Sequence, residues 1–215
     1  VIDLGSVTTP ATAKNGLTVG ASESLRSTGG YTAGSLCGTW GECWPDWYAT
    51  PPLRDDPLSN NADGMAAFSS RGPAPDGRLK PDLVAPGTNI ISARSSLARD
   101  DAFWGVYDPF YAYNGGTSTS APLVAGAAAL TRQLYERNGA SPSAALVKAR
   151  LLLGAADMTP GQYPGLLEMG RAPNNVEGWG RLDVAGALAP QQPRSVWSVD
   201  EAIGATFGDK AMDAT

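Results

Sequence analysis

Short apolar runs between turn residues predict several β-strands in the first half of the chain. Within residues 11–21, Leu17, Val19 and Ala21 alternate with smaller or polar residues, a pattern typical of a half-buried strand. We expect further short strands at residues 66–70, 83–87, 90–93 and 111–113.

The second half of the chain has the composition of helices. Residues 118–138 are rich in Ala and Leu, and Gly139 follows them where a helix-ending glycine is preferred. A second helix is expected from Ser141, as N-cap, through Pro142 to about residue 155, with an apolar face of Leu146, Ala149, Leu152 and Leu153. A last short helix is expected at residues 184–188. Short strands between helices predict an α/β fold with a mostly parallel sheet.

Residues 22–65 follow neither pattern and are rich in Gly, Pro and Asn, so we expect a long surface insertion there. Cys37 and Cys43 lie inside it. They predict a small disulfide formed in an oxidising compartment, although two free thiols are the alternative. The aromatic residues of the insertion could pack its own interior, which we favour, or form an exposed binding platform; they are Trp40, Trp44, Trp47 and Tyr48.

Composition excludes several classes of function. The 215 residues carry a net charge of −5 and contain no basic block, so nucleic acid is not an expected partner. The longest apolar run, residues 121–130, is too short to span a membrane, which needs about 20 residues. The chain contains no His. With no His and no second Cys pair, a zinc site is not expected, and the chain cannot supply the histidine base of a hydrolytic triad.

One stretch carries candidate chemistry. Gly115 and Gly116 end a predicted strand, and Ser118 follows at the start of the long helix. The first N–H groups of a helix have no intrahelical partner and, with the helix dipole, can stabilise a developing oxyanion beside a nucleophile. An ordinary N-cap serine is the alternative reading of the same pattern.

The run GTSTSAPLVAG at residues 116–126 resembles the serine-nucleophile signature of the subtilase family of serine proteases. Further segments resemble the same family over about residues 5–190; they are residues 10–15, 18–21, 68–73, 80–82, 85–88, 91–93 and 178–183, with Asn175. The nearest subgroup by resemblance is the alkaline subtilases with a C-terminal β-barrel. The extra glycine between Asn114 and Thr117 departs from the family pattern and puts a binding role for Asn114 in doubt.

The resemblance implies a doubly wound parallel sheet and a serine endopeptidase that acts on protein or peptide substrates. Ser comes last in the family's Asp, His, Ser order. The catalytic Asp and His and an oxyanion Asn would then lie in an N-terminal part upstream of Val1, and residues 1–215 alone would be inactive. A secreted enzyme is expected. The alternative is a non-catalytic subtilase-like module that binds peptides or has a structural role.

The resemblance also assigns roles to further residues. Ser118 would be the nucleophile, assisted by the Thr117 hydroxyl. Substrate would contact Gly116 and the border of the specificity pocket, at Val7, Thr8, Thr9 and Pro10; a plain connecting loop is the alternative. Ca²⁺ would bind the Asp82 carboxylate and the carbonyls of Lys14 and Gly16. A surface Asp82 paired with Lys80 or Arg78 is the alternative to that calcium site.

These predictions divide the chain into two parts. Residues 1–190 would form the C-terminal part of a catalytic domain, with the insertion at about residues 22–65. Residues 191–215 would form a linker and the possible start of a β domain, because Pro190 and Pro193 flank a change in composition.

Overall fold

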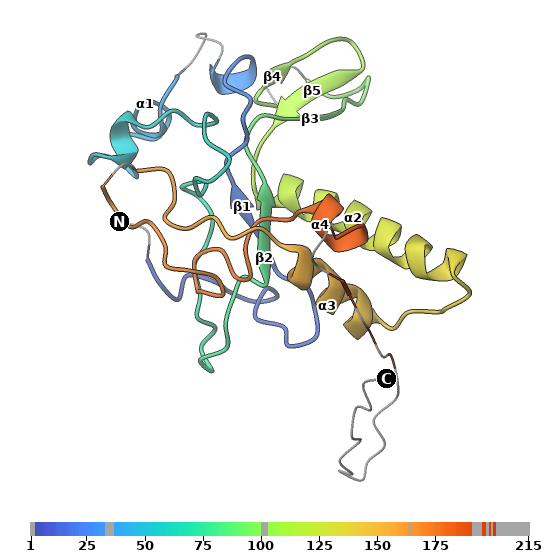
Figure 1. Cartoon of the computed structure of the whole chain (residues 1–215). Coiled ribbons are helices and arrows are strands. Elements are labelled where there is room, and N and C mark those ends of the chain that lie inside the picture. Colours follow the sequence, from blue (N-terminus) through green and yellow to red (C-terminus); the bar gives the residue numbers. More distant parts are fainter. Residues whose placement is uncertain are drawn as a thin grey trace.

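The computed structural model describes residues 3–32, 37–99, 103–163 and 165–190, together with 195–196, 198 and 200. At its centre lie two strands, β1 (Val19–Ser22) and β2 (Leu83–Pro86), which pair in parallel. Figure 1 shows them side by side in the middle of the molecule. A parallel pair with helices packed on it confirms the predicted α/β fold.

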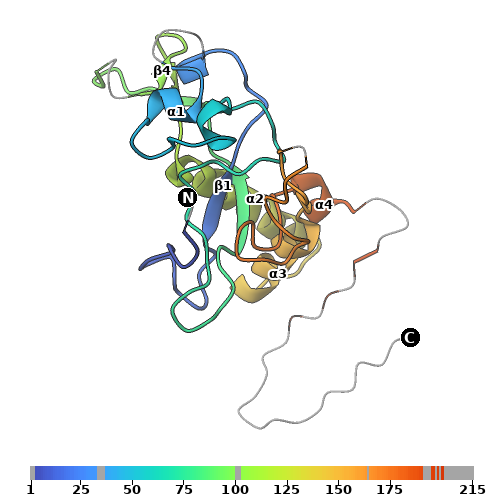
Figure 2. The same ribbon diagram turned by 90° about the vertical axis from the view of Figure 1, so that its left-hand side faces the viewer.

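Helix α2 (Thr117–Arg137) packs on both strands of the parallel pair, and α3 (Ala144–Gly154) and α4 (Val184–Leu188) pack on α2 and on each other. Both views place them together beside the two strands (Figures 1 and 2). Apolar side chains from β2 and all three helices form the core between these layers; they are Leu83, Ala85, Val124, Ala127, Leu151 and Ala187. This core fixes α2 relative to the carboxyl end of the sheet.

The predicted N-cap of the second helix was wrong, and its predicted apolar face was correct only in part. Ser143 caps α3, because its Oγ accepts a hydrogen bond from the N–H of Leu146 at 3.1 Å. Leu151 is buried in the core and Leu152 packs against it, whereas Leu153 is 63% exposed. The predicted last helix is confirmed as α4, which Asp183 caps.

A second sheet lies at the end of the molecule near the carboxyl ends of β1 and β2. It contains β3 (Ile90–Ala93), β4 (Gly105–Val106) and β5 (Tyr111–Asn114), in the antiparallel order β3-β5-β4. This confirms the strands expected at residues 90–93 and 111–113. Because β5 runs directly into α2, this sheet determines where that helix begins.

The strand expected at residues 66–70 does not form. Met65, Ala66 and Ala67 are buried in succession instead of alternating. The N–H of Ser69 donates to the carbonyl of Ala66 at 2.9 Å, which closes a turn. The short apolar run therefore belongs to an irregular buried segment.

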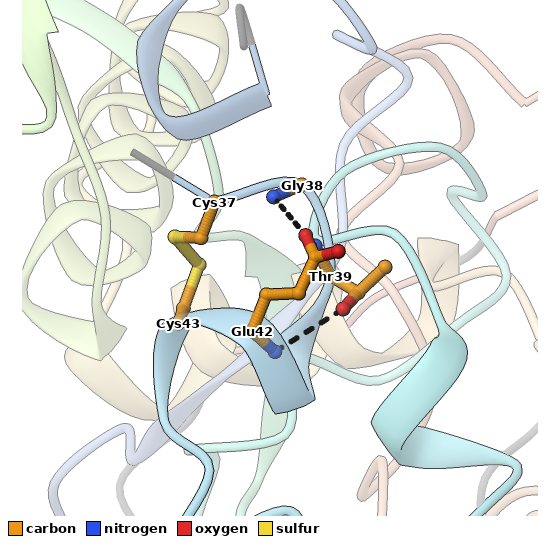
Figure 3. The surroundings of a disulfide bond; sticks show 5 residues. All are labelled: Cys37, Gly38, Thr39, Glu42 and Cys43. Carbon is orange, nitrogen blue, oxygen red and sulfur yellow. Dashed lines mark hydrogen bonds between the residues drawn. A yellow bond between two sulfur atoms is a disulfide. The ribbon is translucent and has the colours of Figure 1, made fainter. Parts of the chain in front are cut away.

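In the described residues of the insertion lie the 3₁₀ helices η1 (Gly30–Thr32) and η2 (Leu53–Asp55) and the short helix α1 (Trp40–Cys43). A disulfide joins Cys37 to Cys43 at α1, as predicted (Figure 3). Thr39 caps this helix in a capping box with Glu42.

Aromatic side chains fill the interior of the insertion, which confirms the packing interpretation. Trp40 is fully buried and stacks on Trp44 at 5.6 Å between ring centroids. Its ring also meets Tyr48 and Phe68 edge-on. Trp47 is the exception, with 77% of its surface exposed.

Within the described residues, no helix combines the length and the apolar character that crossing a membrane requires. The predicted linker and β domain at residues 191–215 lie almost entirely outside the described residues.

Candidate active site

The turn between β5 and α2 is held by hydrogen bonds on both sides. Gly116 has φ 125° and ψ 161°, a conformation that favours glycine, and its N–H donates to the carbonyl of Gly87 at 2.8 Å. The side-chain oxygen of Asn114 accepts from the N–H of Gly115 at 2.9 Å. Asn114 thus supports the turn. Helix α2 begins at Thr117, directly after Gly116.

Ser118 lies in the first turn of α2 and is exposed. A methyl group built on Gly116 would lie 3.2 Å from its Oγ, which shows that the hydroxyl lies over the glycine turn. Ser120, two residues further, is fully buried, and its Oγ donates to the carbonyl of Pro86 at 3.2 Å. One serine therefore anchors the helix to β2 while the other is open to solvent.

Two pockets flank the N-terminus of α2. The first, of about 240 Å³, is lined by Ser118 together with Asn114, Phe103 and residues 90–93 of β3. The second, of about 180 Å³, is lined by Thr117 on one side. The same pocket is also lined by all four residues predicted to border the specificity pocket; they are Val7, Thr8, Thr9 and Pro10. The structure thus brings these residues together with the neighbour of Ser118.

The chemistry available at this point is that of a nucleophile beside a helix N-terminus. Four N–H groups at the start of a helix lack intrahelical acceptors, and the dipole favours negative charge there. Both the unpaired N–H groups and the helix dipole would stabilise an oxyanion formed next to Ser118. The chain contains no histidine, so these residues do not include the general base that a serine nucleophile usually requires.

The residues predicted to bind calcium do not fit that ion. One oxygen of Asp82 lies 2.8 Å from the ammonium of Lys80, and the other lies 2.7 Å from that of Lys148. Lys148 also donates to the carbonyl of Gly16 at 2.9 Å. Calcium takes six to eight oxygen ligands, whereas here both oxygens of Asp82 and the carbonyl oxygen of Gly16 bind ammonium groups. Lys14 is exposed in the same loop.

Asp82 also accepts the N–H of Thr18 at 2.6 Å. Burial acts to raise the pKa of Asp82, but the bonds from Lys148, Lys80 and Thr18 outweigh it, so the pKa of this carboxyl lies below its ordinary value. The alternative of an Asp82–Lys80 pair is therefore correct, although the pair is buried. Sequence patterns did not indicate the second lysine, Lys148, which lies 66 residues from Asp82 along the chain.

A second buried carboxylate, Glu23, was not anticipated from the sequence. It follows β1 and is fully buried. Its carboxylate accepts from the indole N–H of Trp40 at 3.1 Å and from the amide of Gln162 at 3.3 Å. The same amide donates to Asp56 at 2.9 Å. Burial, and next the negative charge of Asp56, raise the pKa of Glu23 to about 8.

Comparison with known proteins supports the resemblance to the subtilase family. The subtilase family of S8 peptidases matches residues 2–180. The serine protease/ABC transporter B family protein tagD of Dictyostelium discoideum is 34% identical over 147 residues, which cover 57% of this chain and 8% of that protein. Serine protease AprX of Bacillus subtilis is 44% identical over 77 residues, which cover 35% of this chain and 17% of AprX.

The chain therefore spans less than a fifth of the length of these relatives. Among solved structures, the CspB protease of Clostridium perfringens matches with a TM-score of 0.51 at 23% identity. That match covers 86% of this chain and 28% of CspB, and it supports the fold. Because the family match extends over most of the 215 residues, the chain belongs to the subtilase family.

Proposed function

We propose that this chain carries the nucleophile of a serine endopeptidase, Ser118, and part of its substrate-binding surface. The observation that supports this most strongly is the exposed hydroxyl of Ser118 in the first turn of α2, between two pockets. Membership of the subtilase family and the likeness to proteins named serine proteases point the same way.

In the proposed reaction, Ser118 Oγ attacks the carbonyl carbon of a peptide bond and passes its proton to a histidine outside these 215 residues. The C=O π electrons move to the oxygen, and the oxyanion is stabilised by the N–H of Ser118 and the helix dipole. When the C–N bond breaks, the amine leaves with that proton, and an acyl group remains on Ser118. Water then releases the acid and restores the hydroxyl.

Thr117 and Gly116 would shape the substrate site from the turn, and Val7, Thr8, Thr9 and Pro10 would border the specificity pocket. The common lining of the second pocket supports this role for Val7 to Pro10 and Thr117. Exposure of Thr8, Thr9 and Pro10 leaves their side chains accessible to a peptide. The proposed substrates are proteins or peptides.

A further polypeptide segment of the same protease would supply the histidine and the aspartate. Two surfaces in the described part of the chain support such a partner. The sheet of β1 and β2 has only two strands there, although parallel sheets are normally larger and covered on both faces. The outer side of α2 exposes Leu123 and Leu130, at 39% and 47%, beside Ala and Gly residues.

The disulfide between Cys37 and Cys43 supports secretion, because such bonds persist in oxidising compartments. The net charge of −5 gives no support for nucleic acid as a partner. Calcium could bind elsewhere in the complete protease. We do not propose it at Asp82, whose oxygens are engaged by two lysines.

Labelling with a phosphonyl fluoride tests the proposal. In the full-length protein, the probe should modify Ser118, identified by peptide mass spectrometry, and Ser118→Ala should abolish the modification. Ser141→Ala is the matched control, since this exposed serine lies outside both pockets and should be dispensable for labelling. An intact, folded full-length protein that leaves Ser118 unmodified would contradict the proposal and support a non-catalytic peptide-binding module.

A further inference from the structure

Two adjacent glycines, Gly115 and Gly116, lie shortly before the nucleophile in the sequence. Each position excludes a larger residue for a different physical reason. Gly116 needs its conformation, with φ 125°. The φ of Gly115 lies outside the left-handed region, so its backbone would accept a side chain. What excludes a side chain at Gly115 is space, because a methyl group there would overlap the six-membered ring of Trp104.

Trp104 is held against this turn by its backbone. It directly precedes β4, and its N–H donates to the carbonyl of Tyr113 in β5 at 3.0 Å. The ring therefore reaches across the end of β5 and covers Gly115, three residues before Ser118.

The insertion packs behind Trp104. The ring of Tyr31 in η1 lies 4.9 Å from it, centroid to centroid, and that of Trp44 lies 6.3 Å away. Phe68, which lies just after the insertion, also contacts Trp104 with an edge-on ring at 6.3 Å between centroids. Trp44 directly follows Cys43, so the disulfide constrains the backbone next to one of these rings. Each ring is a stiff, large side chain, and such packing resists displacement.

The backbone of the insertion also contacts β5 directly. A methyl group on Gly29 would overlap the hydroxyl of Tyr113, and one on Gly30 would lie 3.3 Å from the Cβ of Tyr113. Tyr113 is the residue to which Trp104 donates. The insertion therefore meets the strand that leads into the nucleophile turn at two places, through Tyr113 and through Trp104.

We propose that Trp104 is a positioning residue for Ser118, through which the insertion fixes the turn at Gly115. This inference rests on the proposed protease function. The nucleophilic oxygen has to be held close to the position from which it attacks the substrate carbonyl. A displacement of about 1 Å can lower the reaction rate roughly 10²-fold. Packing from the insertion would hold the turn against such a displacement without contacting the substrate.

The test uses the full-length protein and two readouts: the rate at which phosphonyl fluoride labels Ser118, and kcat and KM on a peptide substrate. Trp104→Ala should lower the labelling rate and kcat about 10–100-fold with little change in KM. Trp104→Phe, which keeps an aromatic ring, should recover most of the rate. Trp47→Ala is the matched control, because Trp47 is a tryptophan of the insertion that is 77% exposed, and this variant should label at the wild-type rate.

A double-mutant cycle gives a second test that does not depend on the folding of W104A. Gly115→Ala should slow labelling strongly when Trp104 is present, because the new methyl group and the indole need the same space. The same change should do much less in the W104F background, since phenylalanine lacks the outer indole atoms that would overlap it.

Equal effects of Gly115→Ala in both backgrounds would overturn the positioning role, and so would wild-type labelling rates in W104A. These results leave the proposed function intact, because Ser118 would still react. A wild-type protein whose Ser118 does not react would instead overturn the proposed function, and the positioning role with it.

Discussion

Glu23 and Asp82 are both carboxylates at the ends of the central strands, yet their surroundings differ in charge. Asp82 precedes β2 and lies between two ammonium groups, those of Lys80 and Lys148. Glu23 follows β1 and is surrounded by neutral donors and a second acid, Asp56. The pKa of Asp82 is therefore lowered, whereas that of Glu23 is raised to about 8. Burial alone does not decide the charge of a carboxyl group; its partners do.

The largest expected effect comes from removing the charge of Asp82. Asp82→Asn should lower the free energy of unfolding by about 3–5 kcal/mol, because the ammonium of Lys80, with a side chain only 2% exposed, would lose its counter-charge. Chemical denaturation of the full-length protein measures this. Asp76→Asn is the matched control, since its pair with Arg78 is largely exposed and should matter little. Equal effects of both variants would contradict the assignment of a buried, mutually dependent pair.

The second prediction concerns Glu23 and pH. Its pKa rises from an ordinary 4.5 when unfolded to about 8 when folded, so the native state retains a proton that the unfolded state has lost. The stability that this proton contributes is complete below pH 4.5 and is lost as pH rises to about 8. Stability should fall by roughly 2–5 kcal/mol over this window.

Glu23→Gln keeps the hydrogen-bonding shape and removes the titration, so the variant should be more stable than the wild type above pH 8. Denaturation at several pH values measures the difference. Glu136→Gln, at the exposed pair with Arg132, is the control and should leave the pH dependence unchanged. Identical pH profiles for wild type and Glu23→Gln would show that Glu23 is ionised in the folded protein.

The smallest expected effect is that of calcium at Asp82. Lysines bind both oxygens of this carboxylate, so calcium should not bind there. The Tm in millimolar calcium should therefore equal the Tm in a chelator, as far as Asp82 is concerned. Thermal denaturation in both conditions measures this. Any calcium-dependent rise in Tm should persist in Asp82→Asn, since it would come from another site. A rise that this substitution abolishes would contradict the fit we describe and restore calcium to Asp82.

The sequence predicted those parts of the molecule whose structure is determined by residues close together along the chain. The turn from β5 into α2, the position of Ser118 and the disulfide all arise within a few residues, where glycine preference and helix initiation act directly. The parallel pair followed from the same local patterns. The resemblance of residues 7–10 to a substrate loop agrees with the second pocket, which these residues line together with Thr117.

Contacts between distant segments could not be predicted in this way. Lys148 reaches Asp82 across 66 residues, and Gln162 reaches Glu23 across 139. An extra glycine was visible at Gly115, but its cause is the ring of Trp104, which only the fold brings there. The strand predicted at residues 66–70 was wrong for a related reason. Tertiary packing buries Ala66 and Ala67 in succession, and the sequence alone does not distinguish such an irregular buried segment from a short strand.

The central claim, that Ser118 is a catalytic nucleophile, is tested most directly by peptide hydrolysis with the full-length protein and its Ser118→Ala variant. We predict that the substitution lowers kcat by about 10⁶-fold, the scale known for loss of the nucleophile in subtilisin, while the fold and Tm stay close to wild type. A folded variant that hydrolyses peptides at a rate within a few fold of the wild type would contradict the claim.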